Sequence, residues 1–295
     1  MYQQVSVLPS NELRARKRRN ITRKIISIAT VIFVLFFCFL QTFPFYLQIV
    51  TSLHGLNYIR ARDTLYLWPR QFSPSNYLQA LRQADFVRGL VNSAIHTVSF
   101  TLITLIVAFI FGYVLGKIKF RGKNIVFIAI LSTLMVPGEV LMIPNFLLVQ
   151  RIGWTDNLLG IILPGAVNVF GIFLFKQFMN TIPDELLESA NIDGASEFTK
   201  IFRIVFPMCK PVITTFVIIT FTAAWNEYLW PMIVINDPTW FTIQLIMNQF
   251  FPRFPLDADQ YLRAAGMILI SLPIIILFLT QQRHFLQSLN VSGMK

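Results

Sequence analysis

Two acidic residues, Glu139 and Glu227, stand inside long apolar stretches of this chain. An ionisable side chain in hydrocarbon is costly, so by default it indicates a functional site. Aromatic rings beside such a residue can stack on the faces of a sugar, while carboxylates and amides hydrogen-bond its hydroxyls. We therefore take these residues as a candidate ligand path: Glu139, Trp225, Asn226, Glu227 and Tyr228. The alternative is that either glutamate lies near a water interface or is satisfied by a helix dipole.

Other patterns that could support catalysis are absent or incomplete. The three histidines, His54, His96 and His284, are dispersed along the sequence and form no zinc-protease signature. Gly112 to Lys117 superficially resembles a nucleotide-binding loop but has one residue too few between its glycines and no following Ser or Thr. Gly112 and Gly116 are better explained as a small-residue packing face. We expect no catalytic residue, no metal site and no bound cofactor, so any ATP hydrolysis must come from another chain.

A second candidate site is the polar segment between two apolar stretches, residues 182–207, which we call the bracket. Pro183 suits a first helical turn, and Asp184 and Glu185 complement the positive end of a helix dipole. Gly194 can adopt the left-handed conformation that ends a helix. A second helix can then run from Ala195 to Ile204, with Pro207 separating it from the next apolar stretch. The sequence therefore predicts a helix–turn–helix here.

The first bracket helix has two distinct faces. Leu186, Ser189, Ala190 and Asp193 share one face, and Asp184, Glu188 and Asn191 share the other. Small side chains on the first face would allow another backbone to approach closely. The competing interpretation is an amphipathic helix lying on the lipid surface. Its weak apolar face and acidic first turn argue against contact with an anionic leaflet, so we favour docking to a protein partner.

The composition places these sites in a membrane protein. Of the 295 residues, 55% are hydrophobic and only 13% are charged, whereas soluble domains carry about 25% charged residues. The net charge of +11 does not indicate nucleic acid, because the basic residues alternate with apolar stretches and form no single stripe. The two cysteines, Cys38 and Cys209, are too few and too far apart to indicate a disulfide framework or a metal cluster.

Windows of about 20 mostly apolar residues, enough to cross ~30 Å of hydrocarbon, give six predicted spans. They run approximately over 25–50, 91–116, 125–149, 157–179, 209–235 and 262–282. Several contain proline, which is tolerated inside a membrane where neighbouring protein or a cavity satisfies the freed carbonyl. A translocation pathway and ordinary helix kinking explain these prolines equally well.

Loop charges predict the orientation, because lysine and arginine are retained on the cytoplasmic side. Basic residues gather in the N-terminal tail, after the second span and after the fourth span, where the bracket lies. Both termini and the bracket are then cytoplasmic. We expect a basic tail over 1–24, a six-span domain over 25–285 and a cytoplasmic C-terminal tail over 286–295.

The bracket also carries a family resemblance. Glu188-Ser189-Ala190, Asp193-Gly194-Ala195 and then Ile204 and Pro207 resemble the EAA motif of permease subunits of ATP-binding-cassette importers. Further matches follow along the chain, including Asn92-Ser93, Pro137-Gly138-Glu139 and Trp225 to Pro231. They resemble the carbohydrate-uptake branch, and within it the shorter, maltose-type second permease. The resemblance implies an all-α type I permease fold of six spans in a bacterial plasma membrane.

The same resemblance implies a role and partners for the chain. It would couple closure of the ATPase to alternating access of a sugar path, through the following bracket residues: Asp184, Glu185, Leu186, Glu188, Ser189, Ala190, Asp193, Gly194, Ala195 and Pro207. Its partners would be a second permease, two ATPase subunits that bind ATP and Mg, an extracytoplasmic solute-binding protein and the lipid bilayer. The rival hypothesis is an ATP-independent channel or secondary transporter, followed distantly by an intramembrane enzyme that uses Glu139 and Glu227.

Overall fold

The computed structural model describes residues 10–55, 66–69, 71–83, 85–249 and 259–292. All regular elements in these ranges are helical, and the β-structure they contain is an isolated bridge between His54 and Phe72. The expected all-α architecture is therefore confirmed for the described part of the chain. The expected tails fall partly outside it, at residues 1–9 and 293–295.

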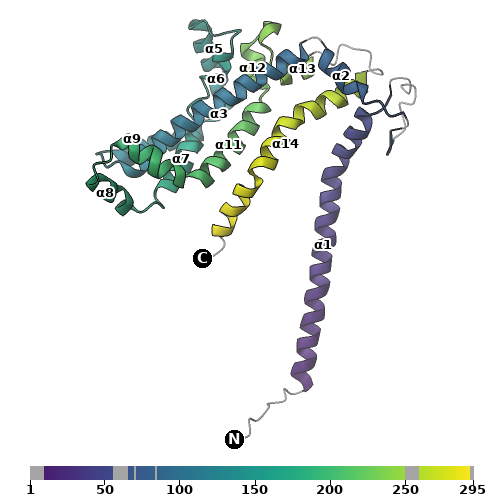
Figure 1. Cartoon of the computed structure of the whole chain (residues 1–295), viewed down its shortest axis with the longest axis horizontal. Helices are drawn as coiled ribbons and strands as arrows, with labels where there is room; N and C mark the ends of the chain where they lie inside the picture. Colours follow the sequence, from purple (N-terminus) through teal and green to yellow (C-terminus); the bar gives the residue numbers. More distant parts are fainter. Residues whose placement is uncertain (1–9, 56–65, 70, 84, 250–258, 293–295) are drawn as a thin grey trace.

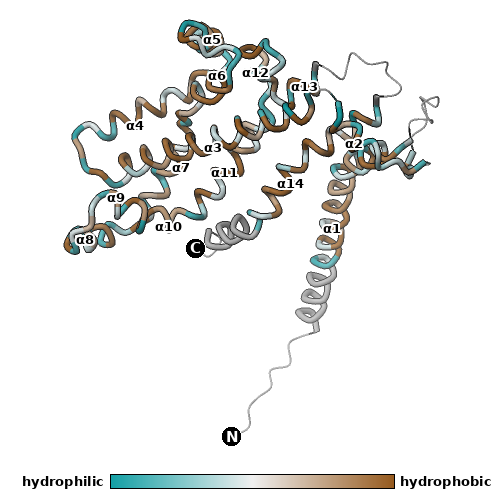
Figure 2. The backbone as a smooth tube through the Cα atoms, turned by 45° about the horizontal axis from the view of Figure 1, so that its top comes forward, coloured by the Kyte–Doolittle hydropathy of each residue, from teal (hydrophilic) through white to brown (hydrophobic). Residues whose placement is uncertain are grey.

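Within the described ranges, three helices are long and apolar enough to cross a membrane. They are α1 (Ser10–Ser52), of which Thr22–Ser52 is the apolar part, α3 (Phe86–Lys117) and α14 (Asp259–Ser292). Each coincides with a predicted span. In Figures 1 and 2, α1 extends away from the body and approaches α14 only near the end that precedes α2. Most of its apolar side chains are exposed. Their exposure would be unfavourable in water, but it is not unfavourable in lipid or against a partner protein.

Each of the other three predicted spans is divided into shorter helices by a break. Over 125–149, α4 (Lys123–Ser132) and η2 (Thr133–Met135) meet η3 (Gly138–Leu141) and α5 (Met142–Arg151) at a 92° bend. Pro137 explains this break, since it has no N–H to continue the helix. With each such bent pair counted as one span, up to five helical segments in the described chain can cross a membrane.

The remaining two spans break at other short turns. Over 157–179, α6 (Leu158–Ile162) is separated from α7 (Val169–Met179) by a turn that contains Pro164. Over 209–235, α11 (Lys210–Trp225) is separated from α12 (Leu229–Val234) by three residues. These interruptions leave polar backbone groups at membrane depth, which is tolerated where they are buried in protein or line a cavity.

Close packing of α3 against α7 forms the centre of the body. A Cβ atom on Gly112 would lie 2.4 Å from Cβ of Phe175, and one on Gly116 would lie 2.5 Å from Cβ of Met179. The two helices therefore approach at a distance that only glycine allows, and the predicted small-residue packing face is confirmed. Phe175 in turn packs edge-on against Phe216 of α11, with ring centroids 5.4 Å apart.

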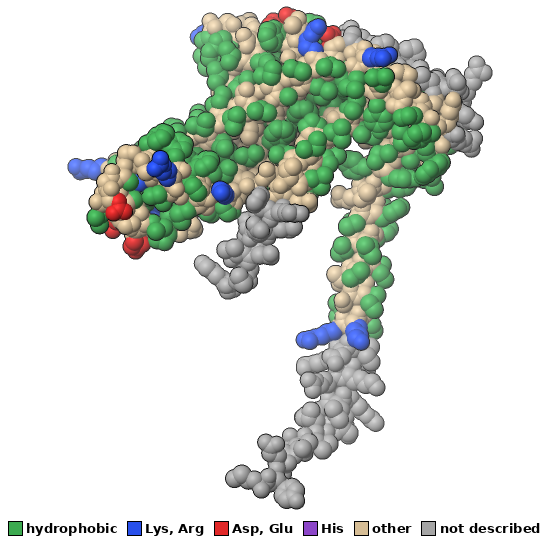
Figure 3. Space-filling view, viewed as in Figure 1, with side chains coloured by type: hydrophobic (Ala, Val, Ile, Leu, Met, Phe, Trp, Pro, Cys, Tyr) green, Lys and Arg blue, Asp and Glu red, His purple; other side chains and the backbone are tan. Residues whose placement is uncertain are grey.

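Short elements close the end of the body opposite the bracket. These are α2 (Ser75–Arg82), η5 (Pro238–Trp240) and α13 (Ile243–Gln249). At the start of α3, the Asn92 amide donates to the carbonyls of Thr239 and Phe241 at 2.9 and 3.0 Å. Figure 3 shows hydrophobic side chains over the middle of the visible face, with charged side chains at the two ends. This distribution is that of a protein surrounded by hydrocarbon.

Candidate functional site: the bracket and a pocket between broken helices

The first bracket helix, α8, spans Asp184–Ile192 with Pro183 at its N-cap. Its end is a Schellman arrangement: Gly194 N–H donates to Asn191 at 3.0 Å, and Ala195 N–H donates to Ala190 at 2.9 Å. Gly194 has a φ of +74°, the left-handed conformation predicted from sequence. The acidic first turn, Asp184 and Glu185, is also as predicted.

The second half of the bracket is one helical segment of changing pitch. Ser196 caps α9 (Glu197–Thr199), and the chain continues as η4, a π-helix over Lys200–Val205, and then α10 (Phe206–Met208). Pro207 lies inside α10, and the 78° bend into α11 comes after it. Because proline lacks an N–H, the Arg203 carbonyl four residues earlier has no α-helical donor, which explains the wider π-turn.

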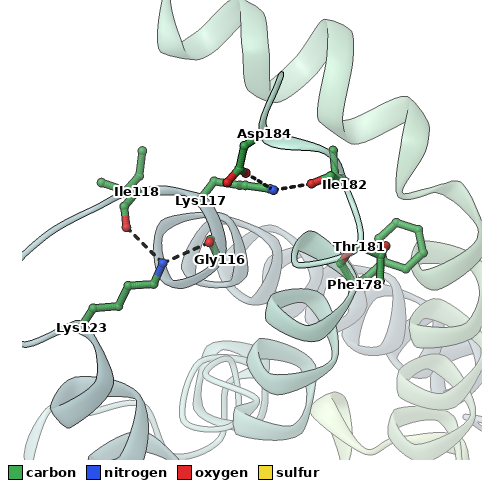
Figure 4. A network of polar contacts seen from close by, with 8 residues as sticks. All are labelled: Gly116, Lys117, Ile118, Lys123, Phe178, Thr181, Ile182 and Asp184. Carbon is green, nitrogen blue, oxygen red and sulfur yellow. Dashed lines mark hydrogen bonds and ion pairs between the residues drawn. The ribbon is translucent and has the colours of Figure 1, made fainter. Parts of the chain in front are cut away.

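Two lysines bind oxygens around the end of α3, and one of them, Lys117, reaches the bracket (Figure 4). Lys117 Nζ lies 2.5 Å from both the Asp184 carboxylate and the Ile182 carbonyl. Lys123 Nζ donates to the carbonyls of Gly116 and Ile118 at 3.0 and 3.2 Å and so caps α3. The hydrogen bond from Lys117 holds the pKa of Asp184 below its ordinary value. The start of α8 is therefore tied to α3 by a charge-assisted contact.

A second set of polar contacts joins both halves of the bracket to α3. The Tyr113 hydroxyl donates to Glu197 at 2.9 Å, and Glu197 also accepts from Lys200. Lys200, only 5% exposed, donates in addition to the Asn191 side chain of α8 at 2.5 Å. A displacement of α8 must therefore move α9 and the last turns of α3, or break these hydrogen bonds.

The structure separates the two faces of α8 as the sequence divided them. Asp184, Glu188 and Asn191 border a hollow of about 260 Å³ that the end of α3 closes on the other side. Leu186, Ser189 and Asp193 are exposed on the outer face. Ala190, expected on that outer face, is only 7% exposed and packs within the chain.

Sequence reasoning missed three large exposed apolar residues of the bracket. Ile192 is 88% exposed and Phe198 is 70% exposed, and Phe202 lies beside Phe198 with ring centroids 4.4 Å apart. Their positions next to the turn could have indicated their exposure, because apolar side chains at a polar helix end have no hydrophobic core to pack into. An exposed apolar patch rimmed by charges is typical of a protein–protein contact.

The three helix breaks meet at one pocket of about 340 Å³, which we call the three-break pocket. Gly138 and Glu139 come from the first break, Pro164 and Gly165 from the second, and Glu227 from the third. Asn145, Phe100 and Trp230 complete much of the wall. The structure thus brings together the two glutamates that are 88 residues apart in the sequence.

The candidate residues next to Glu227, and Trp230 beyond them, make contacts within the chain. Trp225 is 3% exposed, and its indole N–H donates to the Ile270 carbonyl of α14 at 3.0 Å. Asn226 uses its amide on the Thr222 carbonyl at 2.9 Å, at the end of α11. Tyr228 is half-buried against a neighbouring hydrophobic cluster. Trp230 lines the pocket but donates to the Gly160 carbonyl at 3.1 Å, so it holds α12 against α6.

Comparison with solved structures identifies the fold. A chain from a crystal structure of a bacterial ABC transporter, involved in the import of the acidic polysaccharide alginate, matches with a TM-score of 0.82. The match covers 90% of this chain and 98% of that chain at 22% identity. At this identity the match concerns the fold alone.

Relatives of known name cover most of the sequence. The arabinooligosaccharides transport system permease protein AraQ of Bacillus subtilis (strain 168) is 32% identical over 270 residues, 91% of this chain and 95% of AraQ. The sn-glycerol-3-phosphate transport system permease protein UgpE of Shigella flexneri serotype 5b (strain 8401) is 33% identical over 206 residues, 70% of this chain and 73% of UgpE.

A family profile covers the region that contains both candidate sites. The profile described as "Binding-protein-dependent transport system inner membrane component" matches residues 108–291, which include the last turns of α3, the bracket and most of the three-break pocket. Members of this family are non-catalytic transmembrane permeases of ABC importers, as the motif around Gly194 predicted. The chain therefore belongs to the family of binding-protein-dependent transport system inner membrane components.

Proposed function

We propose that this chain is a six-span permease subunit of an ATP-driven carbohydrate importer, with both termini and the bracket on the cytoplasmic side. The names of its relatives support a carbohydrate or a related polyol derivative as substrate. The arrangement of the molecule supports the sidedness, since the bracket and the described ends of α1 and α14 lie toward one side in Figure 1. ATP and Mg would bind to the partner ATPase subunits.

The outer face of the bracket carries the proposal. It presents Leu186, Ile192, Phe198 and Phe202 at a charged end of the molecule, where lipid would not cover them. We assign this face to contact with an ATPase subunit. The opposite face of α8 is hydrogen-bonded to α3 through Asp184 and to η4 through Asn191, so closure of the ATPase pair would be transmitted to the membrane helices. ATP would then shift the transporter toward whichever of its two conformations binds ATP more tightly.

Substitution of the exposed apolar residues tests this assignment. Ile192→Asp and Phe198→Asp should each reduce recovery of the ATPase with the affinity-purified permease by roughly tenfold or more, since central interface residues contribute about 2 kcal/mol. Membrane insertion should not change, because both side chains point away from the body. Leu78→Asp is the matched control, an exposed leucine on α2 at the opposite end, and should leave recovery unchanged.

The rival hypothesis, an ATP-independent transporter or channel, predicts a different outcome. The purified chain alone would then catalyse uptake into proteoliposomes without an ATPase. Full ATPase recovery with both aspartate variants would refute the assigned docking face, even if the importer hypothesis held. The other proposed partners, a second permease and an extracytoplasmic binding protein, should be recovered together with the unmodified chain.

A further inference from the structure

The ionisable residues that line the three-break pocket in the described chain are all acidic. Glu139 and Glu227 both line it, and none of the described residues that line it is lysine, arginine or histidine. Neither glutamate side chain, nor that of Asn145, makes a hydrogen bond or an ion pair to another described residue. These groups are therefore available to a ligand, and no neighbouring cation of the described chain compensates the carboxylates.

The surrounding backbone indicates that a polar ligand is accommodated here. Three separate helices break at this pocket, whereas membrane helices normally satisfy their own hydrogen bonds. Broken helices around polar groups are typical of substrate sites in transporters. The volume of about 340 Å³ falls within the range of small-molecule sites, about 300–1,000 Å³. Phe100 and Trp230 add aromatic surface to the wall.

We propose that the three-break pocket makes this half of the pathway selective by charge, admitting neutral or cationic sugars and disfavouring acidic ones such as uronic acids and sugar phosphates. The inference rests on the proposed function and specifies its substrate class. The solved structure that this chain resembles in fold belongs to a transporter that imports an acidic polysaccharide, and the inference predicts the opposite charge preference for this chain.

The magnitude follows from Coulomb's law. An anionic group about 8 Å from one ionised carboxylate, at an effective dielectric constant of about 20, is disfavoured by roughly thirtyfold. A cation at the same place is favoured by a similar factor. One ionised glutamate is therefore enough to discriminate an acidic sugar from a neutral one, and a second would increase the discrimination.

A reporter cysteine in the pocket measures this potential without knowledge of the substrate. Asn145→Cys is introduced in a Cys38→Ala background, and open membranes that contain the whole complex are treated with two methanethiosulfonates. One carries a trimethylammonioethyl group and the other a sulfonatoethyl group. The ratio of their modification rates is compared before and after the double change Glu139→Gln and Glu227→Gln. The ratio cancels any change in the thiolate fraction of the reporter, which affects both reagents alike.

In the parent protein, we expect the ratio of the cationic to the anionic modification rate to exceed the same ratio measured on a free thiol in solution. In the double variant, this ratio should fall at least tenfold. Asp85→Asn, directly before α3 and not among the residues that line the pocket, is the matched control and should leave the ratio unchanged. Protein without the reporter gives the background from the buried Cys209.

Three results would overturn the inference. They are a ratio that the double variant does not change, a parent ratio that favours the anionic reagent, and a reporter that reacts with neither reagent. The last result would mean that the pocket is not part of an aqueous path. Because modification requires neither uptake nor ATP hydrolysis, these failures are distinguishable from failure of the proposed importer function, which ATPase recovery and ATP-driven uptake measure separately.

Discussion

Gly194 and Gly153 share one backbone conformation in different parts of the molecule. Gly194 ends α8 with a φ of +74°, and Gly153 follows α5 with a φ of +72°. At both positions an added Cβ would meet no atom within 4 Å, so a side chain would be strained by its φ and not by a clash. This pair allows the effect of strain to be separated from the effect of location.

We predict that Gly194→Ala uncouples ATP hydrolysis from uptake, whereas Gly153→Ala does not. Each should cost about 1–2 kcal/mol of stability, the usual penalty for a left-handed residue with a side chain. Only the first alters the turn that joins the two bracket helices. The measurement is ATP hydrolysed per substrate transported, together with the thermal stability of both variants. Equal coupling ratios in the two variants would contradict a specific role for the bracket turn.

The contact between Lys117 and Asp184 should make stability depend on pH. Its lysine side chain is 5% exposed and its aspartate side chain is 65% exposed. Since the pKa of Asp184 is lowered in the folded chain, the pair stabilises the fold above the ordinary carboxyl pKa of about 3.9. That contribution is lost as the pH falls through the folded pKa. Solvent exposure of the aspartate limits it to about 1 kcal/mol or less.

Thermal unfolding of the purified complex between about pH 3 and pH 7 checks this expectation. Asp184→Asn should lower the unfolding midpoint temperature near neutral pH. The midpoint temperature of this variant should then fall less on acidification than that of the parent. Asp193→Asn removes another carboxylate of the bracket that has no ion pair to a described residue, and it should keep the parent's pH dependence. A parent-like acid profile in Asp184→Asn would contradict the assignment.

At the scale of elements, α3 connects the bracket to the membrane body. Its glycines pack against α7, its last turn binds Asp184 through Lys117, and Tyr113 reaches Glu197 one turn earlier. The ring of Tyr113 is buried among apolar residues, so its hydroxyl is the part that serves the bracket. We expect motion of the bracket to reach the membrane mainly through α3.

Tyr113→Phe tests this connection with little change in packing. It removes the donor to Glu197, at a cost of about 1 kcal/mol, and should raise the ATP hydrolysed per substrate transported. Tyr77→Phe removes a hydroxyl that lies 2.7 Å from the Ser52 hydroxyl, at the end away from the bracket. That control should have a similar effect on stability and none on coupling. If both variants kept the parent's ratio, transmission through Tyr113 would be ruled out.

At the scale of the whole molecule, the apolar surface and the charged ends imply a fixed orientation in the bilayer. With six spans, the turn after α5 lies outside and the turn before α8 lies in the cytoplasm. In a Cys38→Ala background, Gln150→Cys should therefore react with a membrane-impermeant maleimide in intact cells. Thr181→Cys should react only after permeabilisation. Labelling of both sites from outside would exclude the six-span arrangement, because residues 150 and 181 would then lie on the same side.

Much of the site could be predicted because its determinants are local. Gly194 ends α8 through a property of its own backbone, and the acidic first turn of α8 follows from the helix dipole. Membrane insertion follows from composition, because the free energy of transfer of a segment from water is approximately the sum of the contributions of its side chains. The motif around Gly194 led to the family for the same reason, since it lies within one continuous segment.

Tertiary structure alone decided the rest. Hydropathy did not show that the predicted span over 125–149 bends by 92°, because hydropathy reports burial in hydrocarbon and a bend changes direction without changing composition. No local pattern shows that Glu139 and Glu227 line one pocket, since this requires three broken helices to converge. The burial of Ala190 and the exposure of Ile192 on the same helix likewise depend on packing against the rest of the chain, which no local pattern shows. Sequence determined which segments enter the membrane, because membrane insertion depends on the summed transfer free energies of neighbouring side chains. It also determined where the bracket turns, because the turn depends on the backbone conformation of Gly194. Contacts between distant segments decided which residues the pocket and the docking face contain.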